Sequence, residues 1–195
     1  MEILQIGSLA TSIAVGYVLG SAPVAYLVAR FRGVDIFEVG TRNPGAANVF
    51  RVVSRSLGTL VLVLDALKGL LAVVMANIFG VIPEATAMAG AAALVGHWHP
   101  VFMRFRGGAG LATAVGAGIG LAPVQGLIAV LLALVTLLII RNTGYAAAVG
   151  YVGFVSLSPF LETTWAATLG ATSLAALVGL RSMAVNILQH HRDKE

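Results

Sequence analysis

The chain has 195 residues, of which 58% are hydrophobic and 10% are charged, and its mean hydropathy is +0.95. Because soluble domains are about 45–50% apolar and about 25% charged, this composition excludes an ordinary soluble domain, a disordered chain and a coiled coil. It also excludes a typical nucleic-acid-binding protein, so no nucleic acid is expected as a partner. The chain has no cysteine, which removes disulfides and thiolate chemistry. The composition indicates a single integral membrane domain over residues 1–195.

Six apolar stretches are candidates for membrane helices, since a spanning helix needs about 20 apolar residues. In chain order they are Ile3–Ala29, Ser56–Val81, Ala85–Phe102, Ala109–Ile140, Asn142–Leu161 and Thr163–Leu180. The first stretch lacks the positively charged flank of a signal peptide, so we expect it to be a retained span. The fourth is too long for one ordinary span and slightly short for two, and Pro123 interrupts it.

The basic residues indicate how these stretches cross the membrane. They cluster in four places, which are Arg30, Arg32, Arg42, Arg51 and Arg55, then Arg104 and Arg106, then Arg141, then Arg181, Arg192 and Lys194. Under the positive-inside rule all four clusters are cytoplasmic. For Arg106 and Arg141 to lie on the same side, the stretch between them must cross twice, with Pro123 at the outer turn, a short helix before it and a longer one after it.

The resulting prediction is an all-α polytopic membrane protein with seven transmembrane helices, its N-terminus outside and its C-terminus cytoplasmic. The alternative is five spans plus a re-entrant segment around Leu111–Leu121, with the same sidedness. Glycines are dense in the spans, and we expect Gly16 and Gly20, and likewise Gly116, Gly118 and Gly120, to let helices pack closely.

The first candidate site is the loop Gly40–Arg51, which combines a hydroxyl, amides, a guanidinium and flexible backbone. Arg51 can pair with an anion, and Thr41, Asn43 and Asn48 can add neutral donors. The alternative interpretation is a polar loop built around an Asn-Pro-Gly turn.

The second candidate site begins at His97 and continues into a glycine-rich segment that leads directly into an apolar helix. Gly107, Gly108 and Gly110 can present backbone N–H groups to a phosphate, and Arg106 can add positive charge. His97 and His99 have no third ligand nearby in the sequence, so no metal is expected.

A third feature is the pair Asp65 and Lys68 inside the second apolar stretch. Ionisable residues within a span are costly and are usually paired or functional. Because they are three residues apart they share one helix face, and we expect a structural ion pair. No motif of a Ser–His or zinc hydrolase occurs, whereas the polar features gather toward the cytoplasmic face, as expected for a membrane enzyme with an amphiphilic substrate.

Several motifs occur together and in order. They are Gly20–Leu27, Gly40–Arg51, Leu64–Gly69, Gly96–Phe102 and Phe105–Thr113. In this combination the chain resembles the bacterial acyl-phosphate-dependent glycerol-3-phosphate acyltransferases, the PlsY family. The resemblance is good up to about Val115 and continues only in hydropathy beyond it. The family has seven spans with the N-terminus outside, which agrees with the topology drawn from charge.

The resemblance implies transfer of a fatty acyl group from a fatty acyl phosphate to the 1-hydroxyl of sn-glycerol 3-phosphate, giving lysophosphatidic acid for phospholipid synthesis. It implies no cofactor and no metal, contact with membrane lipid, and a multi-pass protein in the bacterial inner (plasma) membrane with its active site facing the cytoplasm. The alternatives are a divergent member with an altered acceptor and a catalytically silent membrane protein that binds lipid or phosphate.

Carried over by position, the resemblance assigns roles to ten residues. The expected catalytic residues are Thr41, Asn43 and His97, and the expected substrate- and phosphate-binding residues are Asn48, Arg51, Arg106, Gly107, Gly108, Gly110 and Asn186. The chain departs from the family pattern where Ala47 replaces a threonine, Ala109 replaces a lysine, and Gly144 and Ala147 replace serines.

Overall fold

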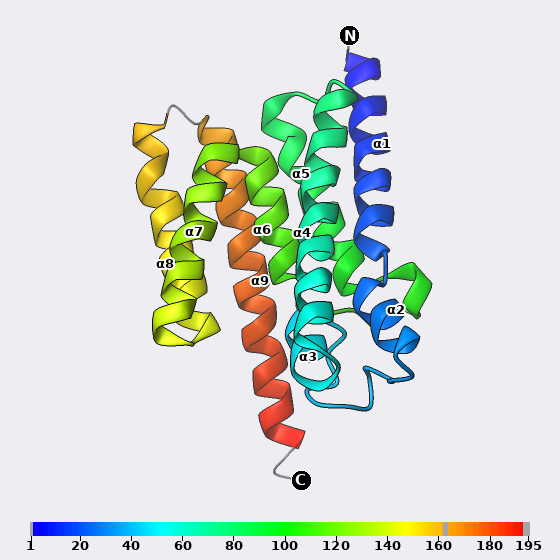
Figure 1. The fold of residues 1–195 in the computed structure, drawn as a ribbon. Helices are drawn as coiled ribbons and strands as arrows, with labels where there is room; N and C mark the ends of the chain where they lie inside the picture. The colour runs from blue at the N-terminus through cyan, green and yellow to red at the C-terminus, as the bar shows by residue number, and fades with distance from the viewer. Residues whose placement is uncertain (1, 162–163, 193–195) are drawn as a thin grey trace.

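The computed structural model describes residues 2–161 and 164–192, with the side chains of residues 3–142, 144–161 and 164–183. These residues form helices joined by loops, without a β-strand, in a bundle whose two chain ends lie at opposite ends (Figure 1). The elements are α1 (Glu2–Ser21), α2 (Val24–Phe31), α3 (Ala46–Val52), α4 (Arg55–Ile78), α5 (Pro83–Trp98), η1 (Val101–Met103), α6 (Leu111–Leu121), α7 (Pro123–Ile140), α8 (Thr143–Leu157), η2 (Ser158–Phe160) and α9 (Trp165–Arg192).

The described helices are of the membrane type. Four segments are long and apolar enough to cross a bilayer, and two further apolar helices are shorter. The four are Ile3–Phe31, Arg55–Ile78, Pro123–Ile140 and Trp165–Met183, and the shorter two are Leu111–Leu121 and Gly144–Phe160. The expected all-α membrane architecture is therefore confirmed.

The sequence led us to expect one continuous helix in the first apolar stretch, and this prediction is wrong. The helix breaks after Ser21, and α2 starts at Val24. Pro23 explains the break, because it lacks a backbone N–H and disfavours the helical conformation of Ala22 before it. The short α2 then buries Ala25 and Ala29 in a small core with Val61 of α4.

Two other helices end at different places from those predicted. The third stretch was expected to run to Phe102, but α5 stops at Trp98 because His99 precedes Pro100. The last stretch was expected to end at Leu180, but α9 continues to Arg192. Arg181 consequently lies within a helix rather than in a loose tail.

The long apolar stretch around Pro123 divides as predicted into a short helix and a longer one. α6 has 11 residues and α7 has 18, and Pro123 occupies the first position of α7, where a missing N–H does no harm. α6 packs against α4, α5, α7 and α9, so it is central to the bundle.

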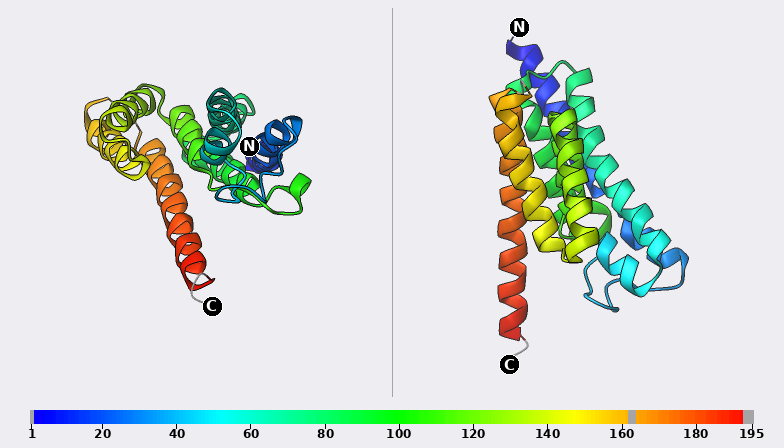
Figure 2. Two further views of the ribbon diagram at one scale, coloured as in Figure 1. Left: turned by 60° about the horizontal axis from the view of Figure 1, so that its bottom comes forward. Right: turned by 60° about the vertical axis from the view of Figure 1, so that its left-hand side comes forward.

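The bundle has a compact half and a more peripheral helix pair. A core of Val73, Leu94 and Leu174 joins α4, α5 and α9 around α6. The pair α7 and α8 lies to one side of this core (Figure 2) and exposes large apolar residues, of which Leu138 is 78% exposed. Such an apolar surface fits contact with lipid rather than with water.

Glycines bring helices into close contact at two interfaces. A Cβ atom on Gly16 or Gly20 of α1 would collide with the carbonyl oxygens of Ala89 or Ala93 of α5. A Cβ on Gly116 of α6 would similarly collide with the backbone of α4. The expected close packing is thus confirmed for these glycines, whereas Gly118 has its nearest neighbour, the Cβ of Ala171, 3.9 Å away.

Gly116→Ala is expected to destabilise the protein, because the added methyl group must push α4 and α6 apart. Overpacking of this kind typically costs about 1–3 kcal/mol, which lowers the unfolding midpoint of a chain of this size by several degrees. Thermal unfolding of the detergent-solubilised protein measures the effect. Gly118→Ala, two residues away on the same helix, is the matched control and should melt like wild type. Equal midpoints for the two variants would contradict the packing described.

Candidate active site

A buried ion pair lies at the centre of the candidate site. Lys68 Nζ is 2.9 Å from Asp65 Oδ1, and the two side chains are only 7% and 4% exposed. Lys68 Nζ also donates a hydrogen bond to the carbonyl oxygen of Ala22, at 3.2 Å. This carbonyl belongs to the break between α1 and α2, where it also accepts a 3.0 Å hydrogen bond from Val24 N, so Lys68 is its second donor in place of a regular helical bond.

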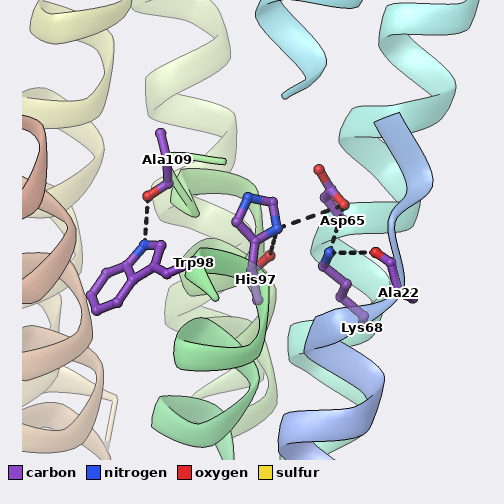
Figure 3. Close-up of polar contacts among 7 residues, drawn as sticks. Ala22, Asp65, Lys68, His97, Trp98 and Ala109 are labelled. Carbon is purple, nitrogen blue, oxygen red and sulfur yellow. Dashed lines mark hydrogen bonds and ion pairs between the residues drawn. The ribbon is translucent and has the colours of Figure 1, made fainter. Parts of the chain in front are cut away.

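His97, the last buried residue of α5, lies beside this pair (Figure 3). Its Nδ1 is 3.3 Å from Thr113 Oγ1, within hydrogen-bond distance, and 3.9 Å from Asp65 Oδ1. Three helices, α4, α5 and α6, therefore meet through polar side chains at one point. Because its Nδ1 edge faces these two partners, the imidazole ring has a fixed orientation.

The glycine-rich segment folds directly over His97. Gly108 N donates a hydrogen bond to the His97 carbonyl oxygen at 3.2 Å. A Cβ on Gly108 would lie 2.6 Å from His97 Nε2 and 2.8 Å from the Pro44 carbonyl oxygen, and one on Gly107 would meet the carbonyl of His97. Only glycine permits this approach, which brings the Nε2 edge of His97, the glycine segment and the Pro44 turn together.

Trp98 fixes the other side of the segment. Its indole Nε1 donates a 2.8 Å hydrogen bond to the Ala109 carbonyl oxygen, as Figure 3 shows. Gly110 follows with a φ of +88°, a conformation that favours glycine, and precedes the first residue of α6. The first N–H groups of α6, which have no partner within the helix, thus begin next to Gly107 and Gly108.

A pocket opens between these elements. Its wall is made by the break between α1 and α2, the Pro44 turn, the ion pair on α4, the end of α5 and the glycine segment. The polar and glycine residues among its lining are Gly20, Tyr26, Asp65, Lys68, His97, Arg106, Gly107 and Gly108. Of the residues expected to act in the site, the structure brings His97, Arg106, Gly107 and Gly108 together here.

The expected residues of the first loop have different positions. The end of the expected loop is helical, because α3 contains both Asn48 and Arg51. Asn48 is 2% exposed, and its side chain accepts from Thr41 N and donates to the carbonyls of Ile36 and Val39 in the preceding loop. Thr41 and Arg51 are exposed and lie outside the pocket lining. The roles predicted for these residues stay predictions.

Asn43 lies near the pocket, whereas Asn186 belongs to the last turns of α9. Asn43 is half-buried beside Pro44, which lines the pocket. The side chain of Asn186, near the end of α9, lies outside the described part of the structure. Gly110 contributes to the site through its backbone, as the residue that precedes α6.

Gly144, which stands where the family has a serine, lies in the first turn of α8. Asn142 Oδ1 accepts hydrogen bonds from Gly144 N at 2.9 Å and Tyr145 N at 3.1 Å, which caps α8. α8 packs mainly on α7 and is not part of the pocket lining.

Sequence reasoning missed two contributors to the site. Arg181 of α9 lies over the Trp98 ring, with its guanidinium carbon 4.9 Å from the ring centre, and approaches the Trp98 carbonyl oxygen at 3.5 Å. Phe37 lies under Arg106, with 4.2 Å between the guanidinium carbon and the ring centre. The only sequence signal for Arg181 is a lone charge after an apolar run, and Phe37 carries none.

In the described ranges no group of three acidic or histidine side chains could hold a metal ion.

Lys68→Met is expected to destabilise the protein strongly, because it leaves the Asp65 charge buried without its ion-pair partner and removes one of the two hydrogen bonds to the Ala22 carbonyl. Breaking a buried ion pair from one side typically costs about 3–5 kcal/mol. Thermal unfolding in detergent measures this loss. The double variant Lys68→Met/Asp65→Asn removes the stranded charge and should melt higher than the single variant. Arg55→Met, at the exposed start of the same helix, is the control for loss of one positive charge. A Lys68→Met protein that melts like this control would refute the stabilising role.

Comparison with known proteins adds to this geometry. Residues 10–194 match the sequence profile of the family described as Glycerol-3-phosphate acyltransferase. A glycerol-3-phosphate acyltransferase of Rubrobacter xylanophilus is 46% identical over 145 residues, which cover 74% of this chain and 71% of that protein. One from Legionella pneumophila is 37% identical over 182 residues, which cover 93% of this chain but only 62% of that protein.

Solved structures agree with the sequence relatives. The glycerol 3-phosphate form of PlsY, an integral membrane glycerol 3-phosphate acyltransferase, superposes with a TM-score of 0.81 at 30% identity, covering 95% of this chain and 94% of that one. Its lysophosphatidic acid form gives a TM-score of 0.80 at the same identity, covering 95% and 93%. The chain therefore belongs to the glycerol-3-phosphate acyltransferase family, the family that its ordered sequence motifs resemble.

Proposed function

We propose that this chain is a membrane acyltransferase of phospholipid synthesis, which moves a fatty acyl group from an acyl phosphate to the 1-hydroxyl of sn-glycerol 3-phosphate. The products are lysophosphatidic acid and inorganic phosphate. The observation that carries the proposal is the match of 95% of the chain to PlsY in its glycerol 3-phosphate form. The pocket lined by Arg106, the glycine segment and the buried polar network supports it from this chain's own residues.

The pocket suits the recognition of a phosphate. No hydrogen bond or ion pair among the described residues occupies the Arg106 guanidinium, so its N–H groups are free to bind an anion. Gly107 adds a backbone donor, and the start of α6 adds the positive end of a helix dipole. Donors that are in place before the substrate binds stabilise the negative charge that develops during acyl transfer.

The proposed reaction needs no protein nucleophile. The 1-hydroxyl oxygen of glycerol 3-phosphate attacks the carbonyl carbon of the acyl phosphate, and the bond from that carbon to the phosphate oxygen breaks. The phosphate leaves with the electron pair, and a substrate phosphate oxygen takes the hydroxyl proton. In this scheme Arg106 and the glycine segment hold phosphate, while His97, whose orientation Thr113 and Asp65 fix, contacts substrate through its Nε2 edge.

Thr41, Asn43, Asn48, Arg51 and Asn186 complete the proposed set by their positions in the family motifs. Ala109 supplies no charge where the family has a lysine, so Arg106 carries more of the phosphate binding in this chain. A second hypothesis, favoured by the loss of the lysine at Ala109, is that the enzyme uses a different acceptor. A screen of acceptors distinguishes this hypothesis from the use of glycerol 3-phosphate.

Arg106→Met is expected to lower kcat/KM for glycerol 3-phosphate by about 10- to 150-fold, since a hydrogen bond from a charged group is worth about 1.5–3 kcal/mol. The assay is phosphate release from palmitoyl phosphate by the purified protein, with and without glycerol 3-phosphate. Arg104→Met removes an exposed arginine two residues away, outside the pocket lining, and should retain activity. Folded wild-type protein without acceptor-dependent release would contradict the proposed function, and equal losses in both variants would contradict the role of Arg106.

We further propose that the chain crosses the bacterial inner membrane seven times, with the N-terminus outside and the pocket on the cytoplasmic side. The basic clusters lie in or beside the loops before α3 and after α5, the turn before α8 and the C-terminal part of α9. All four segments lie in the half of the bundle that contains the C-terminus (Figure 1). The positive-inside rule favours the cytoplasm for that end.

The absence of native cysteine allows a direct test of this topology. Glu84→Cys and Arg55→Cys place single thiols at the exposed starts of α5 and α4, which lie at opposite ends of the bundle (Figure 1). A membrane-impermeant maleimide should label Glu84→Cys in intact cells, and Arg55→Cys only after the membrane is permeabilised. The reverse labelling pattern would contradict the proposed orientation.

A further inference from the structure

The aromatic ring of Phe37 lies under the guanidinium of Arg106, and this contact joins two segments far apart in the sequence. Phe37 belongs to the loop between α2 and α3, whereas Arg106 belongs to the segment between η1 and α6. The guanidinium carbon is 4.2 Å from the ring centre, well within the range of a cation–π contact. Tyr26, which lines the pocket, has its ring centre 6.1 Å from that of Phe37.

The backbone around Phe37 is held firmly in place. Phe37 N donates a 2.9 Å hydrogen bond to Asp35 Oδ1. The preceding residue, Ile36, is fully buried in the core that contains Val49. Asn48 Nδ2 donates to the carbonyls of Ile36 and Val39, on either side of Phe37. The loop therefore presents the ring from a rigid base.

Stacking leaves the binding edge of the arginine free. An arginine uses the face of its planar guanidinium to stack on an aromatic ring, while its N–H donors point outward in the same plane. Phe37 can thus restrict the rotamers of the exposed Arg106 side chain without competing for its hydrogen bonds. A restrained donor loses less conformational entropy when an anion binds.

We propose that Phe37 is a positioning residue, which holds the Arg106 guanidinium at the pocket so that it binds the phosphate group of the substrate. This inference rests on the proposed function for the identity of the substrate, but the contact itself does not. It also gives Asn48 a positioning role, because its side chain holds the loop that carries Phe37.

The test measures binding of sn-glycerol 3-phosphate to the purified full chain by calorimetry, together with steady-state kinetics. Phe37→Leu should raise the Kd and KM for glycerol 3-phosphate by about two- to fivefold, the change that corresponds to about 0.5–1 kcal/mol for an exposed cation–π contact. The kcat should change little. Phe37→Tyr keeps the ring and should restore the affinity of wild type. Phe160→Leu is the matched control and should leave binding unchanged, because Phe160 is 80% exposed and η2 lies at the other end of the bundle.

A double-mutant cycle separates positioning from a general structural effect. With Arg106→Met in place, Phe37→Leu should cause no further loss of affinity, because the ring acts through the guanidinium. An equal loss in both backgrounds, or wild-type affinity in Phe37→Leu, would overturn the proposal. If Phe37→Leu does not fold, Arg106→Lys serves instead, since it keeps the charge without the planar stack; wild-type affinity in that variant would overturn the proposal.

The outcomes distinguish this inference from the proposed function. Phe37-dependent binding of glycerol 3-phosphate in a wild-type protein that transfers no acyl group would support the positioning role and refute the acyltransferase activity. Acyl transfer that is insensitive to Phe37→Leu would do the opposite. A wild-type protein that does not bind glycerol 3-phosphate would refute both.

Discussion

The contact of Lys68 with Asp65 and the Ala22 carbonyl is the interaction on which the rest of the site depends. Pro23 breaks the first apolar helix, and at the break the Ala22 carbonyl accepts from Val24 N instead of making a regular helical bond. Lys68 of α4 adds a second hydrogen bond to this carbonyl, and Asp65, three residues earlier, balances the lysine charge. The break is what creates one wall of the pocket, so the ion pair stabilises the fold and shapes the site together.

The site is assembled by close backbone contacts around that pair. Glycines at the α4–α6 interface bring Thr113 near His97 and Asp65, and glycines after η1 let their segment lie directly on His97. At each of these glycines a side chain would collide with the neighbouring segment, so the close contact requires glycine. The proposed phosphate binding therefore relies on backbone donors and one exposed guanidinium instead of a conventional catalytic triad.

Much of this could be predicted from the sequence, and the failures have physical causes. The two helices on either side of Ala122 and the Asp65–Lys68 pair follow from local rules. These rules are that proline favours a helix start and that charges three residues apart share one helix face. The break at Pro23 was missed because the residues around it are as apolar as those of a continuous span. Phe37 and Arg181 could not be found from local pattern, since both act through contacts with residues far away in the chain.

A structure of this chain in lipid with sn-glycerol 3-phosphate bound would test the assignment of the pocket most directly. We expect the phosphate group within hydrogen-bond distance of the Arg106 guanidinium and of the Gly107 N–H, with Phe37 still stacked on the arginine and Lys68 still hydrogen-bonded to the Ala22 carbonyl. A phosphate bound elsewhere, with Arg106 turned away from it, would contradict the assignment of this pocket as the active site.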